Sequence, residues 1–293
     1  VTNWEIDPAA RFVLENFCQK HGITVETGKP ISTPSAVDLL PSAKIGRTGN
    51  VISAIAHDLS GNKYDVVSAT CSCIDMSLVN PHRGGFNAKD AEQYFSAAAM
   101  LSCALLVNED LNFLVENVIQ EKDMRRRYDK LFPVPHVKMG TDRVGAMNRP
   151  RCYQSTMPPV DEEPRRFDTY QAALDVLYGR GVYEALVTKI DCLKASGRPT
   201  GAVKRCRATG AKEELAIEEA LLLMGFPVNW FDGCGALDDD EDAKWRLLGN
   251  SCNVGDLELF YKSLRRVHGA CHGRDVAAER EEAIQAFRAK RGF

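Results

Sequence analysis

Four side chains suited to nucleophilic catalysis follow one another along this chain. Cys73 comes just after an apolar run, and Glu116 ends a second apolar run that begins at Leu111. Arg149 and Arg151 follow as an Arg-x-Arg pair. A deprotonated cysteine is a strong nucleophile, and a carboxyl group and guanidiniums can relieve charge that develops on an attacked ring. The residue types therefore indicate covalent catalysis through a thiol.

The segments that carry these residues are typical of an α/β protein. Strands are expected near 23–26, 51–56, 64–69 and 111–115, and helices over 8–20, 89–107, 168–193, 211–224 and 275–290. Alternation of strand, helix and strand implies a mostly parallel sheet with helices on both faces, so the sequence predicts a doubly wound α/β fold. Cys73 then lies just beyond the carboxyl end of a strand, where such sheets perform their chemistry.

Composition excludes several other classes of protein. The 293 residues are 44% hydrophobic and 26% charged, as in a globular domain, and no apolar run approaches the ~20 residues that a membrane span needs. The net charge of −3 argues against a wholly basic nucleic-acid coat but not against a local basic surface. Ten cysteines without a paired CxxC set favour reduced thiols over a disulfide scaffold. The segment 268–272 has two histidines and a cysteine but no partner cluster, so no metal is expected.

The motifs and their order resemble the DNA (cytosine-5) methyltransferases, and are closest to the animal de novo type. The similar segments are Cys73–Gly85 for the catalytic loop, Leu114–Val118 for the acid motif, Arg149–Tyr153 for the arginine motif, and Gly225–Val228 and Arg246–Ser251 for the last two motifs. The resemblance spans most of the chain. It implies a Rossmann-like, S-adenosylmethionine-dependent methyltransferase sheet with a small target-recognition insert.

The resemblance also implies a reaction, methyl transfer to C5 of cytosine in double-stranded DNA. Cys73 would add to C6 of a base flipped out of the duplex, because C5 alone is a poor nucleophile. Glu116 would stabilise the activated ring as an acid, and Arg151, with Arg149, would hold the target nucleotide. The sulfonium of S-adenosylmethionine is already activated, so this chemistry needs no metal.

Contacts to the cofactor follow from the same resemblance. The implied residues are Glu5, Ile6, Asp58, Leu59, Asn250 and Ser251. Glu5 would bind the ribose hydroxyls and Asp58 the adenine amino group. Asn250 and Ser251 would close over the methionine end.

Contacts to DNA are expected from the catalytic loop and from a basic stretch, Lys194–Lys212, that has six basic residues and no acid. The residues predicted to contact DNA are Ser77, Val79, Asn80, Arg198, Lys204, Arg205 and Arg207. Val79 would fill the gap left by the flipped base, and Arg198 would enter a groove. A solvated basic loop, and a Val79 that packs beneath its own loop, stay open as alternatives.

The chain departs from the family pattern in three ways. The family's glycine-rich first motif is absent before Trp4, Ser72 replaces a proline, and the recognition stretch is short. We therefore expect either a fragment or weakened cofactor binding. Two alternatives stay open: an inactive regulatory homologue that partners an active methyltransferase, and a tRNA cytosine-5 methyltransferase. The intact Cys73 speaks against the first, and the sequence that follows it speaks against the second.

A Pro-rich stretch, 155–166, indicates a domain boundary. We expect a catalytic and cofactor-binding core over 1–158, a target-recognition region over 159–224, and a return to the core over 225–293. The resemblance implies a homo- or hetero-oligomer with a related methyltransferase. The expected location is the nucleus in a eukaryote and otherwise the cytoplasm.

Overall fold

The chain forms two compact units in a computed structural model. The sheet unit consists of residues 29–139 and 150–158, and the helical unit of residues 1–28, 140–149 and 159–293. The structure describes residues 2–3, 8–20, 26–27, 64–71, 76–77, 82, 84–85, 94, 97–98, 101, 104–105, 108–132, 134, 136–140, 145–160, 167–194, 198–268 and 276–293.

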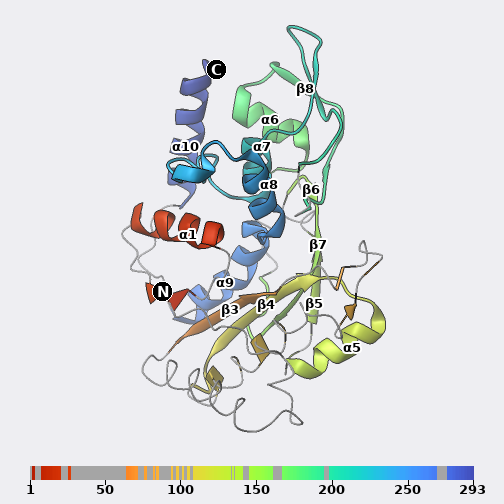
Figure 1. Cartoon of the computed structure of the whole chain (residues 1–293), viewed down its shortest axis with the longest axis vertical. Helices are drawn as coiled ribbons and strands as arrows, with labels where there is room; N and C mark the ends of the chain where they lie inside the picture. Colours follow the sequence, from red (N-terminus) through yellow and green to blue (C-terminus); the bar gives the residue numbers. More distant parts are fainter. Residues whose placement is uncertain are drawn as a thin grey trace. The chain divides into compact units, whose positions relative to one another are not determined.

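The sheet unit contains a four-stranded sheet in the order β3-β4-β7-β5 (Figure 1). Its strands are β3 (Val66–Thr70), β4 (Asn112–Val118), β5 (His136–Gly140) and β7 (Pro150–Ser155). Strand β3 runs parallel to β4, and β7 runs antiparallel to it. In β4 the consecutive residues Phe113, Leu114 and Val115 are all buried. A continuous apolar run of this kind is typical of a strand covered on both faces.

Helix α5 (Lys122–Leu131) follows β4 and presents one buried residue, Tyr128, between charged turns. The Tyr128 ring packs edge-on to Tyr94, with centroids 5.5 Å apart, and against Phe132 at 5.0 Å. Gln154 of β7 donates a hydrogen bond to Asp129 Oδ1 at 3.3 Å. These contacts hold α5 against the sheet.

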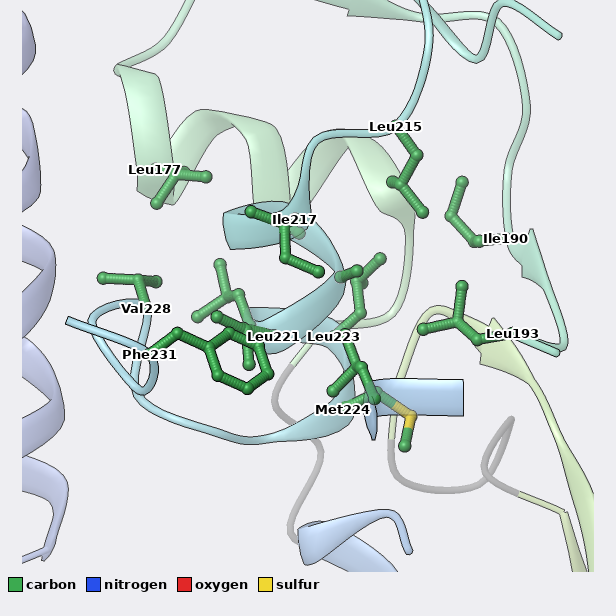
Figure 2. Packing of buried hydrophobic residues seen from close by; sticks show 14 of the residues in the cluster. Leu177, Ile190, Leu193, Leu215, Ile217, Leu221, Leu223, Met224, Val228 and Phe231 are labelled. Carbon is green, nitrogen blue, oxygen red and sulfur yellow. The ribbon is translucent and has the colours of Figure 1, made fainter. Parts of the chain in front are cut away.

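The helical unit is built around α7 (Ile217–Met224), in which every residue except Glu218 is buried. Figure 2 shows the α7 side chains among Leu177, Ile190, Leu193 and Phe231. A helix that is apolar on nearly all sides belongs in a protein interior. The other helices are α1 (Pro8–Lys20), α6 (Tyr170–Tyr178), α8 (Glu241–Asn250), α9 (Val254–His268) and α10 (Val276–Arg291), with a 3₁₀ turn at Gly235–Leu237.

Short strands complete the helical unit. Strands β8 (Tyr183–Ala185), β10 (Lys204–Cys206) and β11 (Lys212–Glu213) form an antiparallel sheet in the order β11-β10-β8. Strand β6 (Met147–Asn148) pairs in parallel with β9 (Ile190–Asp191), and β1 (Thr2–Asn3) with β2 (Glu26–Thr27).

The predicted α/β class is confirmed, although the described sheet is mixed rather than mostly parallel. The helices expected at 8–20 and 275–290 and the strands near 64–69 and 111–115 are confirmed. The helix expected over 168–193 is wrong beyond Tyr178, because Gly179, with φ +92°, ends α6 and strands follow. The helix expected over 211–224 begins only at Ile217. The strand expected at 51–56 lies outside the described residues.

Within the described part of the chain, no helix is both long enough and apolar enough to cross a membrane.

Candidate active site at the ends of β3 and β4

A buried ion pair lies at the carboxyl end of β4. Arg151 Nε contacts Glu116 Oε1 at 2.8 Å, and each residue is 7% exposed. Antiparallel pairing sets Tyr153 opposite Glu116 and Arg151 opposite Val118, so the pair is diagonal on one face of the sheet. A buried charge is costly unless it is paired, so each side chain holds the other in place. The structure thus brings together two of the predicted catalytic residues.

Asn117 connects this strand end to the end of β3. Its Nδ2 donates to the Cys71 carbonyl at 3.0 Å, and its Oδ1 accepts from the Val118 amide at 2.8 Å. Asn117 is 1% exposed. The hydrogen bond fixes the main chain two residues before Cys73. No role was predicted for Asn117, whose only signal was its place beside Glu116 in the acid motif.

Two cysteines near the site are unsuited to act as nucleophiles. Burial, and to a smaller extent the Glu116 carboxylate, raise the pKa of Cys71 to about 12. Burial likewise raises the pKa of Cys152 to about 12. Both stay protonated at neutral pH, and only the thiolate is strongly nucleophilic. This favours Cys73 over Cys71, although Cys73 itself lies outside the described residues.

Arg149 makes contacts that correct its predicted role. It is 2% exposed, and its guanidinium donates to the main-chain oxygens of Leu193, Gly249 and Ser251 at 2.9, 3.0 and 2.6 Å. These contacts commit the guanidinium to the protein's own main chain. The prediction that Arg149 holds the target nucleotide alongside Arg151 is therefore withdrawn.

Two of the six residues predicted to bind the cofactor, Asn250 and Ser251, are among the described residues. Asn250 is exposed at the last position of α8. Ser251 follows it, and its Oγ donates to the Leu248 carbonyl at 2.8 Å. Glu5, Ile6, Asp58 and Leu59 lie outside the described residues.

The predicted contact of Lys204 with DNA is wrong, because this residue is 3% exposed. Its Nζ lies 2.6 Å from Glu219 Oε1 and donates to the Glu214 carbonyl at 3.0 Å. The hydroxyls of Tyr170 and Tyr178 also donate to Glu219, each at 2.6 Å. Burial, and then Glu219, raise the pKa of both tyrosines well above the ordinary value. Lys204 is therefore part of a buried network.

Two other basic residues of this stretch, Arg198 and Arg205, have acidic neighbours in space. Arg198 lies 3.3 Å from Glu214, and Arg205 lies 3.4 Å from Glu184. Strand pairing places Arg205 directly opposite Glu184, which lies outside the basic stretch Lys194–Lys212 in the sequence. Arg207 is exposed. In the catalytic loop Ser77 is partly buried, whereas Val79 and Asn80 lie outside the described residues.

The residues that the structure describes include no group of three or more His, Cys, Asp or Glu side chains arranged to hold a metal ion.

Known structures share this architecture. The structure is similar to the Entamoeba histolytica methyltransferase EhMeth, with a TM-score of 0.55 and 11% identity over 91% of this chain and 89% of that one. It is similar to the S. pombe Dnmt2 methyltransferase, with a TM-score of 0.52 and 13% identity over 91% of this chain and 90% of that one. The chain has the fold of these methyltransferases. No protein-family model and no curated protein matches the sequence.

In this fold, the position of the Glu116–Arg151 ion pair can be compared with the edge of the sheet that binds ligands. Open α/β sheets bind their ligands outside the carboxyl ends of the parallel strands. In this methyltransferase fold Glu116 stands at that end of β4, opposite Thr70 of β3. The predicted Rossmann-like methyltransferase fold is thus confirmed, and its sheet presents a buried carboxylate where a substrate is expected.

Proposed function

We propose that this protein transfers a methyl group from S-adenosylmethionine to C5 of cytosine in double-stranded DNA, through a covalent adduct on Cys73. One observation carries the proposal. The buried Glu116–Arg151 pair lies at the carboxyl end of β4, beside the end of β3 from which the chain leads to Cys73. A fixed carboxyl group beside the end of β3, three residues before Cys73 in the sequence, suits addition to a pyrimidine ring.

The chain's own residues would act in sequence. The Cys73 thiolate forms a bond to C6 of a flipped cytosine as the C5–C6 double bond opens, and a proton passed from the Glu116 carboxyl group to N3 neutralises the charge displaced onto the ring. S-adenosylmethionine supplies a methyl group on a sulfonium, which C5 of the adduct accepts. Loss of the C5 proton to solvent then restores the C5–C6 double bond as the thiolate leaves C6. Arg151 holds the Glu116 carboxyl group in one orientation throughout.

Asn250 and Ser251 would bind the amino-acid end of S-adenosylmethionine. The Asn250 side chain is exposed, so its amide can offer both a donor and an acceptor. The Ser251 hydroxyl donates to Leu248 and can still accept. Polar groups of this kind fit the ammonium and carboxylate of the cofactor.

Transfer of a labelled methyl group tests the proposal. The protein is incubated with S-adenosylmethionine labelled on its methyl group and with either duplex DNA or tRNA. We expect label in DNA at C5 of cytosine, reduced about 100-fold or more in Glu116→Gln because one electrostatic stabiliser is lost.

The other outcomes of this assay are equally informative. Label in tRNA alone would make the protein a tRNA methyltransferase. Folded protein that labels neither substrate would contradict catalysis and favour the regulatory homologue.

A further inference from the structure

Arg149 closes the carboxyl end of α8. The guanidinium Nη2 donates to the main-chain oxygens of Gly249 and Ser251, and Nη1 donates to that of Leu193. The last carbonyls of a helix have no partner within the helix, and a cation at this end is favoured by the helix dipole. Arg149 supplies both a donor and a positive charge. The opposite end of α8 is capped by Asp240, whose side chain accepts from the Ala243 amide at 2.8 Å.

The connection from α8 to α9 is held on its other side by Asn253, which is 3% exposed. Its Oδ1 accepts from the amides of Gly255 and Asp256 at 2.8 and 3.2 Å, which caps α9. Its Nδ2 donates to the Leu223 carbonyl of α7 at 3.4 Å. The main chain around Asn250 is thus anchored at both ends by buried side chains.

We propose that Arg149 is a positioning residue for the cofactor. It holds the main chain of 249–251 in the geometry with which Asn250 and Ser251 bind S-adenosylmethionine, and this role rests on the proposed function. A planar guanidinium can reach three carbonyls at once, whereas the compact ammonium of a lysine cannot reproduce that fork. Arg149 therefore acts at the cofactor, and Arg151 acts through Glu116.

Three variants of the whole chain test the role of Arg149. Arg149→Met removes the donors, and Arg149→Lys keeps a cation with a different geometry. Lys244→Met is the matched control, because Lys244 is a buried cation on the same helix that donates to the Asp238 carbonyl near the opposite end, at 2.7 Å. For each variant we would measure the dissociation constant for S-adenosylmethionine by calorimetry, amide hydrogen exchange over 246–256, and the temperature of unfolding.

We expect Arg149→Met to weaken cofactor binding about tenfold or more, since hydrogen bonds from a charged donor are lost. Amides at 249–252 should exchange about tenfold faster in this variant through local opening. Arg149→Lys should be intermediate in both measurements. Lys244→Met should lower the unfolding temperature while leaving the dissociation constant within about twofold of wild type.

Wild-type exchange and affinity in a folded Arg149→Met protein would overturn the inference. If that variant does not fold, the same result in Arg149→Lys overturns it. Failure of the wild type to bind S-adenosylmethionine would contradict the proposed function and the cofactor role together. Amide hydrogen exchange needs no cofactor, so this measurement decides separately whether Arg149 holds the main chain of residues 249–251.

Discussion

At the scale of single residues, Asn117 ties Cys71, just after the end of β3, to the strand that carries the acid. Asn117→Ala removes the donor to the Cys71 carbonyl and leaves a group without its partner. We expect it to cost about 1–3 kcal/mol of stability and to lower kcat, measured by chemical denaturation and by methyl transfer. Asn112→Ala is the control, because Asn112 starts the same strand and its side chain donates to the Asp110 carbonyl in an exposed contact. Equal losses in both variants would contradict a special role for Asn117.

Thiol reactivity provides a second prediction at this scale. Hydrogen bonds from Thr209 lower the pKa of Cys206, whereas burial raises the pKa of Cys71 and Cys152 to about 12. In native protein at neutral pH, iodoacetamide should modify Cys206 before the other two, as read by mass spectrometry of digested samples. Modification of Cys71 ahead of Cys206 would contradict this order.

The same pKa values predict a loss of stability in alkali. The folded thiols of Cys71 and Cys152 keep their protons up to about pH 12, whereas unfolded thiols lose theirs near the ordinary value of 9.0. Their contribution to stability is therefore complete below pH 9 and is lost as the pH rises toward 12. Denaturation followed across this range, with Cys152→Ala as the comparison, should show a shallower decline in the variant. An identical decline of stability in wild type and Cys152→Ala would contradict a raised pKa for Cys152.

At the scale of elements, the network of Lys204 and Glu219 joins β10 to α6 and α7. Lys204→Met leaves Glu219 buried without its cation, and we expect a loss of about 3–5 kcal/mol. The neighbouring Arg205 pairs with Glu184 in an exposed contact, so Arg205→Met should cost less than about 1 kcal/mol. Thermal unfolding of the two variants makes the comparison. Unchanged stability in Lys204→Met, together with weaker DNA binding, would restore its predicted role as a phosphate contact.

At the scale of the whole molecule, the charge pattern limits electrostatic binding. The net charge is −3, and the basic surface predicted to meet DNA keeps Arg198, Arg205 and Arg207, two of them beside acids. If these three residues neutralise phosphates, the logarithm of the binding constant should fall with the logarithm of salt with a slope of about −3. Fluorescence anisotropy over a salt series measures this slope. A value steeper than about −6 would require basic contacts from other parts of the chain.

Sequence alone predicted the features that depend on local pattern or on motif order. Helix α1 and strands β3 and β4 follow from apolar spacing, and the acid and arginine motifs singled out Glu116 and Arg151, although their ion pair was not predicted. The contacts of Arg149 were not predictable in this way, because Gly249 and Ser251 lie 100 and 102 residues away. Burial of Lys204 likewise depends on its contact with Glu219 on another element. Composition around a residue does not say which side of a strand faces the core.

Covalent trapping tests whether Cys73 is the nucleophile. The protein is incubated with S-adenosylmethionine and duplex DNA that carries 5-fluorocytosine, and a denaturing gel reports any stable adduct. Fluorine at C5 blocks the elimination that frees the thiol, so a working nucleophile remains attached. We expect an adduct with wild type and with Cys71→Ala, and none with Cys73→Ala. No adduct from folded wild-type protein, or one that persists in Cys73→Ala, would contradict it.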